Sequence, residues 1–302
     1  MWFWYSLIAL LCWSGSDLFS KIGCRDRDDR YADLKMVTAV GAVMGIHALI
    51  QIFTGKAVVT WSVFLSYLPV SLLYILSMAI GYAGLKYIEL SISSPICNSS
   101  GAIVAILVII TRGIGSVTGL QLTAVILVSI GVIGLGIVDL TEDDELRAMR
   151  QQKSNYKYAK SLLAIAIPVI YCLLDALGTF ADSIVLEKLD EDAANTSYEL
   201  MFLFCGIACF IYTALIKRAK YSFKREIPKY VGALAETGGQ AAYIYAIADT
   251  EHVALAAPMI SAYCMLSVIW SSIFLKEKLS WKHYIMIAVV IAGIVILGAS
   301  DV

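Results

Sequence analysis

Apart from Asp139 and Glu199, which stand at the very ends of their stretches, four acidic residues lie inside long apolar stretches of the sequence: Asp17, Asp175, Asp182 and Glu236. An ionised side chain at the centre of a bilayer costs about 2.5–3.5 kcal/mol on insertion scales, so each of these residues calls for a physical reason. A buried carboxylate can bind a proton or attract a cationic ligand. The four acids therefore point to a polar cavity inside an apolar protein.

Polar and aromatic residues recur at helical spacing around these acids, which places them on common helix faces. If the three faces converge, they line one cavity. The tyrosines among them can also belong to an interfacial belt or to helix packing. The residues are Trp13, Asp17 and Ser20 in the first stretch, Tyr171, Asp175, Thr179 and Asp182 in the second, and Glu236, Gln240 and Tyr243 in the third.

A structural explanation competes with a cavity role for two of the acids. Asp17 can pair with Lys21 one turn later, with the lysine extending to the membrane surface, and the sequence leaves this alternative open. Asp182 lies near the end of its apolar stretch, where a wetted carboxylate at the interface is the preferred interpretation. Asp175 and Glu236 have no basic residue within one helical turn, so they are the leading candidates for binding cargo or protons.

Two prolines, Pro95 and Pro258, stand near the starts of apolar stretches. A proline one turn inside a helix frees a backbone carbonyl and kinks the helix. Asn98 and Ser261 follow the prolines at equal spacing, with Tyr263 nearby, and Asn98 is the preferred contact because its amide both donates and accepts hydrogen bonds. The neighbouring small residues expected to serve helix packing are Ser99, Ser100 and Ala262.

The elements that must position these residues are transmembrane helices. Of the 302 residues, 60% are hydrophobic and 16% are charged, against about 25% charged in a soluble domain. Such a composition excludes a soluble enzyme, a disordered chain and a disulfide-stapled secreted domain, and the net charge of −1 argues against nucleic-acid binding. A spanning helix needs about 20 apolar residues, and ten stretches qualify: 3–22, 36–54, 67–87, 91–111, 119–139, 161–184, 198–216, 230–248, 252–275 and 283–300.

Basic residues are distributed unevenly among the predicted loops. The loops after the first, third, fifth, seventh and ninth stretches hold 20 of the 23 Lys and Arg residues. Because cytoplasmic loops are enriched in Lys and Arg, this bias predicts a multi-pass protein of the cell membrane with both termini outside the cytoplasm.

The chain contains an internal duplication. Three matched pairs agree in register within five residues, and they predict a first five-helix repeat at 1–140, a connecting loop at 141–160 and a second repeat at 161–302. An odd number of spans per repeat forces the second copy upside down, a construction found in many secondary transporters. The pairs are Asp17 with Asp175, Pro95 with Pro258 and Gly131 with Gly293, at offsets of 158, 163 and 162.

Residues 274–297 and 13–23 resemble parts of an EamA-type repeat, and with ten spans in two halves the whole chain is similar to the drug/metabolite transporter superfamily. Two features depart from the family pattern: Lys276 precedes Glu277 where the family has glycine, and the matching loop at 111–113 carries no acid. The resemblance implies convergence of helices 1, 6 and 8 on a cavity. It also implies cargo among amino acids, organic cations, nucleotide sugars and drugs.

The sequence favours a secondary active transporter that moves an organic cation or an amine-bearing compound such as an amino acid by alternating access. Carboxylates and aromatic faces both attract positive charge, and Asp175 and Glu236 are also the candidates for proton coupling. An anionic cargo is disfavoured because the only basic residues near span interiors, Lys21 and Lys86, lie near their ends. The predicted binding residues are Trp13, Asp17, Asn98, Tyr171, Asp175, Glu236, Gln240, Tyr243, Ser261 and Tyr263.

Other function classes remain open, namely a membrane-embedded enzyme, a passive channel and a scaffold. The seven cysteines form no CxxC pair and the three histidines are scattered, so the sequence predicts no metal, no cofactor and no catalytic residue. It also lacks the phosphate-binding motif of ATP-driven pumps. The expected partners are a small-molecule substrate and the lipid bilayer, with the protein a monomer or a homodimer.

Overall fold

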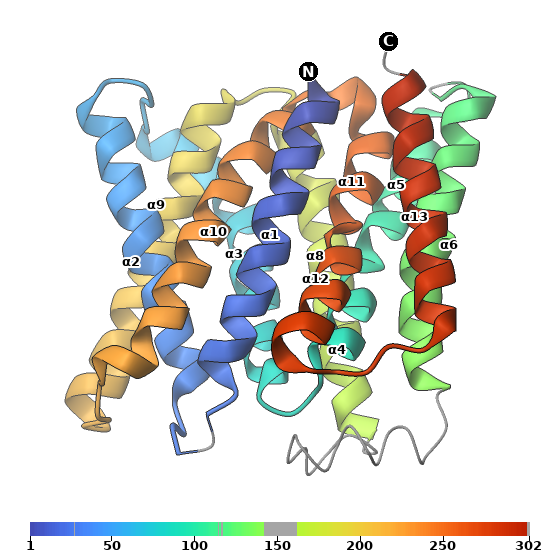
Figure 1. The fold of residues 1–302 in the computed structure, drawn as a ribbon. Helices are drawn as coiled ribbons and strands as arrows, with labels where there is room; N and C mark the ends of the chain where they lie inside the picture. Colours follow the sequence, from blue (N-terminus) through green and yellow to red (C-terminus); the bar gives the residue numbers. More distant parts are fainter. Residues whose placement is uncertain (27, 114, 116, 142–161, 301–302) are drawn as a thin grey trace.

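The computed structural model describes residues 1–26, 28–113, 115, 117–141 and 162–300, and this part of the chain is a bundle of helices without strands (Figure 1). The predicted connecting loop at 141–160 thus lies outside the described residues, apart from its first position. The helices are α1 (Trp2–Cys24), α2 (Ala32–Phe53), α3 (Trp61–Leu85), α4 (Leu90–Asn98), α5 (Ser100–Arg112), α6 (Gly119–Leu140), α8 (Leu162–Val185), α9 (Glu191–Phe210), α10 (Phe223–Ala248), α11 (Val253–Ser261), α12 (Tyr263–Trp270) and α13 (Trp281–Ser300).

Shorter helical turns extend three of these elements. The π-helical turns η2 (Ile211–Ile216) and η4 (Ser271–Leu275) continue α9 and α12, and the 3-10 turn η3 (Thr250–His252) precedes α11. Counting α4 with α5 and α11 with α12 as single crossings, nine segments of the described chain are long and apolar enough to span a membrane. The chain is therefore an all-α membrane protein, as predicted.

The predicted span that is not among these nine is the eighth, 230–248, which corresponds to α10; this helix is 26 residues long and begins with several charged residues. It lies within the bundle and packs along α1 (Figure 1). If α10 also crosses the membrane, the number of spans is ten, and this count stays a prediction.

Four helices begin four to seven residues earlier than the apolar stretches predicted, namely α2, α3, α9 and α10. The first turns of α2, α9 and α10 hold charged residues, so hydropathy leaves these turns out although they are helical; the first turn of α3, which starts at Trp61, holds none. Side-chain caps explain two of the starts: the hydroxyl of Thr60 accepts the backbone N–H of Val63, and the carboxylate of Asp190 accepts that of Ala193.

The predicted fourth and ninth spans are each divided into two helices. The divisions fall at Ser99 and Ala262, in each case four residues after the proline, Pro95 or Pro258. The predicted proline kinks are therefore present as breaks, each at the same distance from its proline. Such breaks bring backbone ends and polar side chains to the middle of the bundle.

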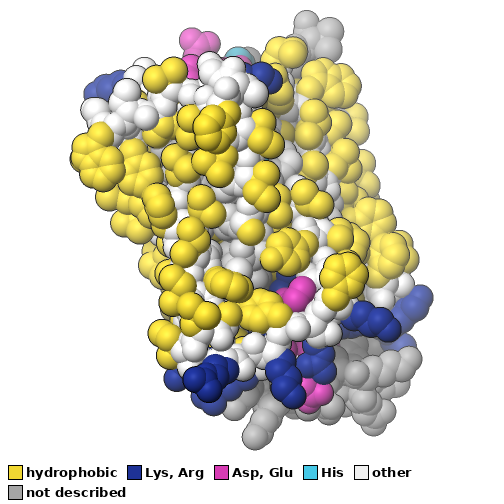
Figure 2. Space-filling model, turned by 90° about the vertical axis from the view of Figure 1, so that its left-hand side faces the viewer, with side chains coloured by type: hydrophobic (Ala, Val, Ile, Leu, Met, Phe, Trp, Pro, Cys, Tyr) yellow, Lys and Arg dark blue, Asp and Glu magenta, His cyan; other side chains and the backbone are white. Residues whose placement is uncertain are grey.

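The described basic loops, those after α1, α3, η2 and η4, lie at the end of the bundle opposite to the two chain termini (Figure 1). On the face drawn in Figure 2, Lys and Arg side chains concentrate at that end, below a broad hydrophobic band. The structure thus separates the loops as the charge bias predicts, while the side of the membrane that each end faces stays a prediction.

Two lysines that the sequence assigns to loops belong to helices at that basic end. Lys35 lies in α2 and Lys229 in α10, and the side chains of both are 1% exposed. Their ammonium groups lie 2.9 and 3.7 Å from the carboxylate of Asp29, and 3.5 and 3.1 Å from that of Glu226. This shared network compensates the buried charges and joins α2, α10 and the loop that follows α1.

Helix packing follows the pattern expected of two related halves. Helix α1 packs on α10, and its predicted counterpart α8 packs on α3, while α2 packs on α9, α6 on α13 and α5 on α11. In Figure 1, α1 starts at the end that holds the termini, whereas α8 starts at the opposite end. The division into two inverted repeats stays a prediction, and α1 and α8 run in the opposite directions that it requires (Figure 1).

The matched glycines Gly131 and Gly293 lie where α6 and α13 cross. A Cβ at Gly131 would lie 3.0 Å from the carbonyl oxygen of Met286, and one at Gly293 would lie 2.9 Å from that of Ala124. We expect Gly131→Leu and Gly293→Leu each to destabilise the protein by about 1–3 kcal/mol because the helices must separate. The midpoint of thermal unfolding in detergent measures this loss.

The matched control is Gly119→Ala at the exposed start of α6, where an added Cβ meets nothing within 4 Å. Its midpoint should equal or exceed that of the wild type. Unchanged midpoints for both leucine variants would contradict the close α6–α13 crossing.

Candidate functional site

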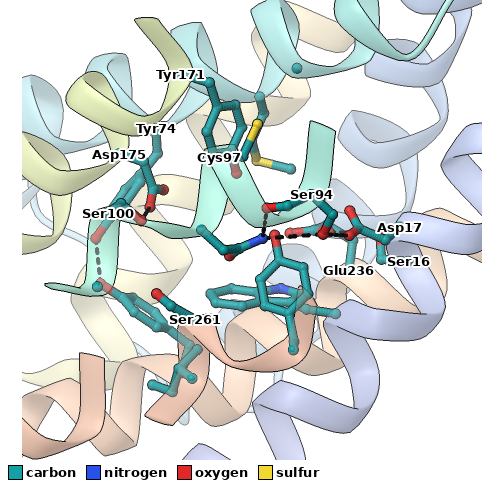
Figure 3. Close-up of a pocket in the computed structure, with 18 of the residues that line it drawn as sticks. Ser16, Asp17, Tyr74, Ser94, Cys97, Ser100, Tyr171, Asp175, Glu236 and Ser261 are labelled. Atoms are coloured by element: carbon teal, nitrogen blue, oxygen red, sulfur yellow. Dashed lines mark hydrogen bonds between the residues drawn. The ribbon is translucent and has the colours of Figure 1, made fainter. Parts of the chain in front are cut away.

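A cavity lies inside the bundle and is lined by residues of α1, α3, α4, α5, α8, α9, α10, α11 and α12 (Figure 3). The space that atoms leave empty there is about 980 Å³, part of it open to solvent. All ten residues that the sequence singles out for binding line this cavity, so the predicted helix faces do converge. Those residues are Trp13, Asp17, Asn98, Tyr171, Asp175, Glu236, Gln240, Tyr243, Ser261 and Tyr263.

The carboxylate of Asp17 connects α1 to both broken helices. Its Oδ2 atom accepts hydrogen bonds from the hydroxyl of Ser94 at 2.5 Å and from that of Ser267 at 2.7 Å. Ser94 belongs to α4 and Ser267 to α12. The acid is therefore held by neutral donors from two other helices.

Lys21 does not form the ion pair with Asp17 that the sequence left open. Its Nζ atom donates to the carbonyl oxygens of Leu85 at 2.6 Å and Ile88 at 2.5 Å, where α3 ends. The residue is 1% exposed, so it does not extend to the membrane surface. A buried ammonium at the end of a helix is well placed to satisfy carbonyl groups that have no helical partner.

Asp175 and Glu236 are each held by one serine. The hydroxyl of Ser100 donates to Oδ2 of Asp175 at 2.7 Å, and that of Ser16 donates to Oε2 of Glu236 at 2.7 Å. The expectation that Ser100 serves only helix packing is therefore wrong, because the break before α5 turns its hydroxyl toward the acid on α8 (Figure 3).

The three carboxylates of Asp17, Asp175 and Glu236 share one space, since all three residues line the same cavity. Among the described residues that line the cavity, none is Lys, Arg or His. An ionised carboxylate can accept about four hydrogen bonds, so the serine donors leave capacity on every acid. The cavity therefore offers negative charge without an internal cation to neutralise it.

Aromatic rings form one wall of the cavity. The ring centroid of Trp13 lies 5.2 Å from that of Tyr243 and 5.8 Å from that of Tyr263, and Tyr74 lies 6.0 Å from Tyr243 in an edge-on arrangement. Ring faces attract cations within about 6 Å, with Trp the strongest. Carboxylates and rings thus favour the same kind of ligand.

Asn98 has a positioning role rather than a free amide. Its Nδ2 atom donates to the backbone oxygen of Ser94 at 2.8 Å and approaches the Ser94 hydroxyl at 3.3 Å. It thereby orients the serine that holds Asp17. Ser261 lies opposite Gly101, where α5 and α11 cross.

Asp182 is the acid for which the sequence interpretation is wrong. It is 0% exposed, not wetted at the interface, and it accepts hydrogen bonds from Tyr67, Tyr243 and Tyr74 at 2.7, 3.2 and 3.4 Å. Although α8 ends three residues later, α3 and α10 cover this last turn. The position of a residue near the end of a helix therefore does not show whether other helices bury it.

Several cavity residues carry no distinctive sequence signal. Serines and tyrosines also serve packing and interfacial belts, so type and spacing alone do not separate them. Only the nearness of some to the paired prolines could have drawn attention to them. The residues missed are Ser16, Ser94, Ser100, Tyr74, Tyr82 and Tyr198.

The fold and this cavity define a multi-pass membrane protein with a polar binding site inside its bundle. The sequence model of the EamA-like transporter family matches residues 162–299, the second predicted repeat. Over these residues the chain matches the EamA-like transporter family, as its sequence resemblance predicts. The match holds despite the departure at Lys276, which lies within the matched residues.

Comparison with solved structures supports the fold over the whole chain. Twenty-eight chains match, and one crystal structure, described only as that of a protein, has a TM-score of 0.65 at 13% sequence identity. The alignment covers 97% of this chain and 94% of the other. At this identity the likeness concerns the fold alone, and no curated protein matches the chain.

The buried position of Lys21 has a measurable consequence. In Lys21→Met the apolar stem is kept, but the carbonyl oxygens of Leu85 and Ile88 lose this donor. An unsatisfied buried polar group costs about 1–3 kcal/mol, so we expect a clearly lower thermal midpoint in detergent. The control is Lys56→Met at an exposed position, and equal midpoints for the two variants would contradict a structural role for Lys21.

Proposed function

We propose that the chain is a secondary active transporter that carries a small amine-bearing or cationic organic metabolite across the cell membrane by alternating access. The observation that carries this proposal is the cavity itself. It holds three carboxylates and a wall of aromatic rings, and none of its described lining residues is basic. A cationic cargo would supply the charge that this site lacks.

Asp175 and Glu236 are the proposed primary contacts of the cargo. Each carries a carboxylate group that lines the cavity, on α8 in the case of Asp175 and on α10 in the case of Glu236, and that accepts a hydrogen bond from a serine hydroxyl. The cargo ammonium would form charge-assisted hydrogen bonds to them, which are stronger than bonds between neutral groups. Trp13 and Tyr243, whose rings are in contact, would cover the apolar part of the cargo.

Asp17 has a different proposed role because it already accepts from both broken helices. A cargo that competes for this carboxylate would loosen the link between α4 and α12. By loosening this link, cargo binding would favour a change in the packing of the two proposed halves. Rocking of inverted repeats about a central site is a mechanism shared by many transporters.

The charge of the cargo can be tested without knowing its identity. A thermal-shift screen of the purified protein against a metabolite library reports binding because a ligand of the folded state raises its apparent stability, by about 2.7 kcal/mol at a hundredfold excess over Kd. We expect the stabilising compounds to carry a cationic nitrogen. Stabilisation by anions such as nucleotide sugars, with no effect of amines, would contradict the proposal.

Transport itself is tested in proteoliposomes with radiolabelled phenethylamine, which presents one ammonium group and one aromatic ring. Wild-type protein should show saturable exchange with counterflow, whereas a channel shows no counterflow. Asp175→Asn and Glu236→Gln should each slow exchange at least about tenfold, the equivalent of about 1.4 kcal/mol, while inserting normally.

The matched control is Glu251→Gln, an exposed acid at the end that holds the termini. It should exchange phenethylamine at the wild-type rate. Exchange at that rate by both cavity variants would refute the assignment of the two carboxylates.

A further inference from the structure

A fourth buried carboxylate, that of Asp182, lies beyond the wall of the cavity and does not line it. Its Oδ1 atom accepts the hydroxyl of Tyr67 at 2.7 Å. Its Oδ2 atom lies within hydrogen-bond distance of two further phenols, Tyr243 at 3.2 Å and Tyr74 at 3.4 Å. The cluster joins α3, α8 and α10 toward the end of the bundle that holds the chain termini.

Tyr74 and Tyr243 connect this cluster to the cargo cavity because both also line the cavity. Their hydroxyls are hydrogen-bonded to each other, and that of Tyr74 also lies 3.1 Å from the hydroxyl of Thr179, another lining residue. Each phenol has one proton to donate. The two protons must therefore be shared among Asp182, Thr179 and the partner phenol.

The charge on Asp182 decides how those protons are placed. An ionised carboxylate only accepts, so it draws the phenol protons toward itself, whereas a protonated one carries a proton that it can donate. On protonation, at least one phenol proton is released to point toward Thr179 or into the cavity. The protonation state of Asp182, which the cargo does not touch, thereby decides whether the cavity has one hydrogen-bond donor more or one fewer.

The groups that face Asp182 are neutral phenols from the helices packed around it. They are Tyr67 and Tyr74 of α3 and Tyr243 of α10, with Tyr198 of α9 beside Tyr74 at a ring distance of 6.0 Å. On its own helix the nearest acid is Asp175, two turns earlier. At the end of α5, the guanidinium of Arg112 binds Glu187 and the backbone of Thr250.

No ion pair of the described residues involves Asp182, so its negative charge is supported by hydroxyl dipoles alone. Transfer of one proton from hydronium converts the carboxylate to a neutral acid: one O–H bond forms on Asp182, one O–H bond of hydronium breaks, and water is left. Release of that proton restores the anion. The geometry thus provides a reversible protonation site at bilayer depth.

We propose that Asp182 is the proton-binding site of the transporter, separate from the carboxylates that bind cargo, and that Tyr74 and Tyr243 link its occupancy to the cavity. This inference rests on the proposed transport function. It moves the coupling proton from Asp175 and Glu236 to a residue outside the cavity. By linkage, cargo binding changes the proton affinity of Asp182 by the same factor as protonation changes cargo affinity.

Protonation can be measured without any cargo. Infrared difference spectra of the purified full chain between mildly acidic and mildly alkaline buffer report the C=O stretch of protonated carboxylic acids. We expect the spectrum of Asp182→Asn to lack one component of this band that the wild type shows. The control is Asp249→Asn, which replaces a half-buried acid in the turn before α11 and should retain that component. A spectrum identical to that of the wild type would overturn the proposal.

Tyr67→Phe is the second variant, for use if Asp182→Asn does not fold. It removes a donor from Oδ1 of Asp182 and leaves the cavity lining intact, because Tyr67 does not line the cavity. The same infrared component should change frequency, since its hydrogen bonding has changed. An unshifted component would show that it does not arise from Asp182.

Coupling is tested in proteoliposomes with radiolabelled phenethylamine by comparing exchange at equal pH with accumulation driven by a pH gradient. Asp182→Asn should keep exchange within about twofold of wild type and lose gradient-driven accumulation, whereas Asp175→Asn should lose both. Wild-type accumulation by Asp182→Asn would overturn the proposal. Normal exchange by Asp175→Asn would instead overturn the cargo assignment, and the infrared result would still decide the role of Asp182.

Discussion

Carboxylates at bilayer depth must obtain hydrogen bonds from the protein, and in this chain serine and tyrosine hydroxyls provide them. Asp17 takes two serines, Asp175 and Glu236 take one each, and Asp182 takes tyrosines. Hydroxyl groups stabilise the anions but leave their negative charge in place, whereas a lysine or an arginine would neutralise it. The acids therefore remain able to bind a cation or a proton, and each bond comes from another helix, so the same contacts hold the bundle around the cavity.

The broken helices make this arrangement possible. The paired acids Asp17 and Asp175 bind opposite segments of one broken helix, through Ser94 of α4 and Ser100 of α5. A continuous helix would carry these two serines, six positions apart, on different faces. The proline-linked break thus supports both repeat-matched acids at once, and a change in its geometry would alter both contacts together.

The sequence predicted the acids and their helix faces because an ionisable residue in a long apolar stretch is costly and therefore conspicuous. It could not predict the serines, since Ser16 and Ser100 are of a type that equally serves packing. Asp182 was misjudged because its burial depends on α3 and α10, which are distant in sequence. The sequence left a surface role open for Lys21 because its acceptors lie at the end of α3, which is distant in sequence. Apolar windows missed the first turns of α2, α9 and α10 because those turns hold charged residues.

An experimental structure of the protein with phenethylamine bound tests the cargo site most directly. The account predicts the ammonium group within hydrogen-bond distance of Asp175 or Glu236 and the ring against Trp13, with the serine contacts of the acids retained or exchanged for the amine. An amine bound outside the cavity, or inside it with its ammonium away from every carboxylate, would contradict the account.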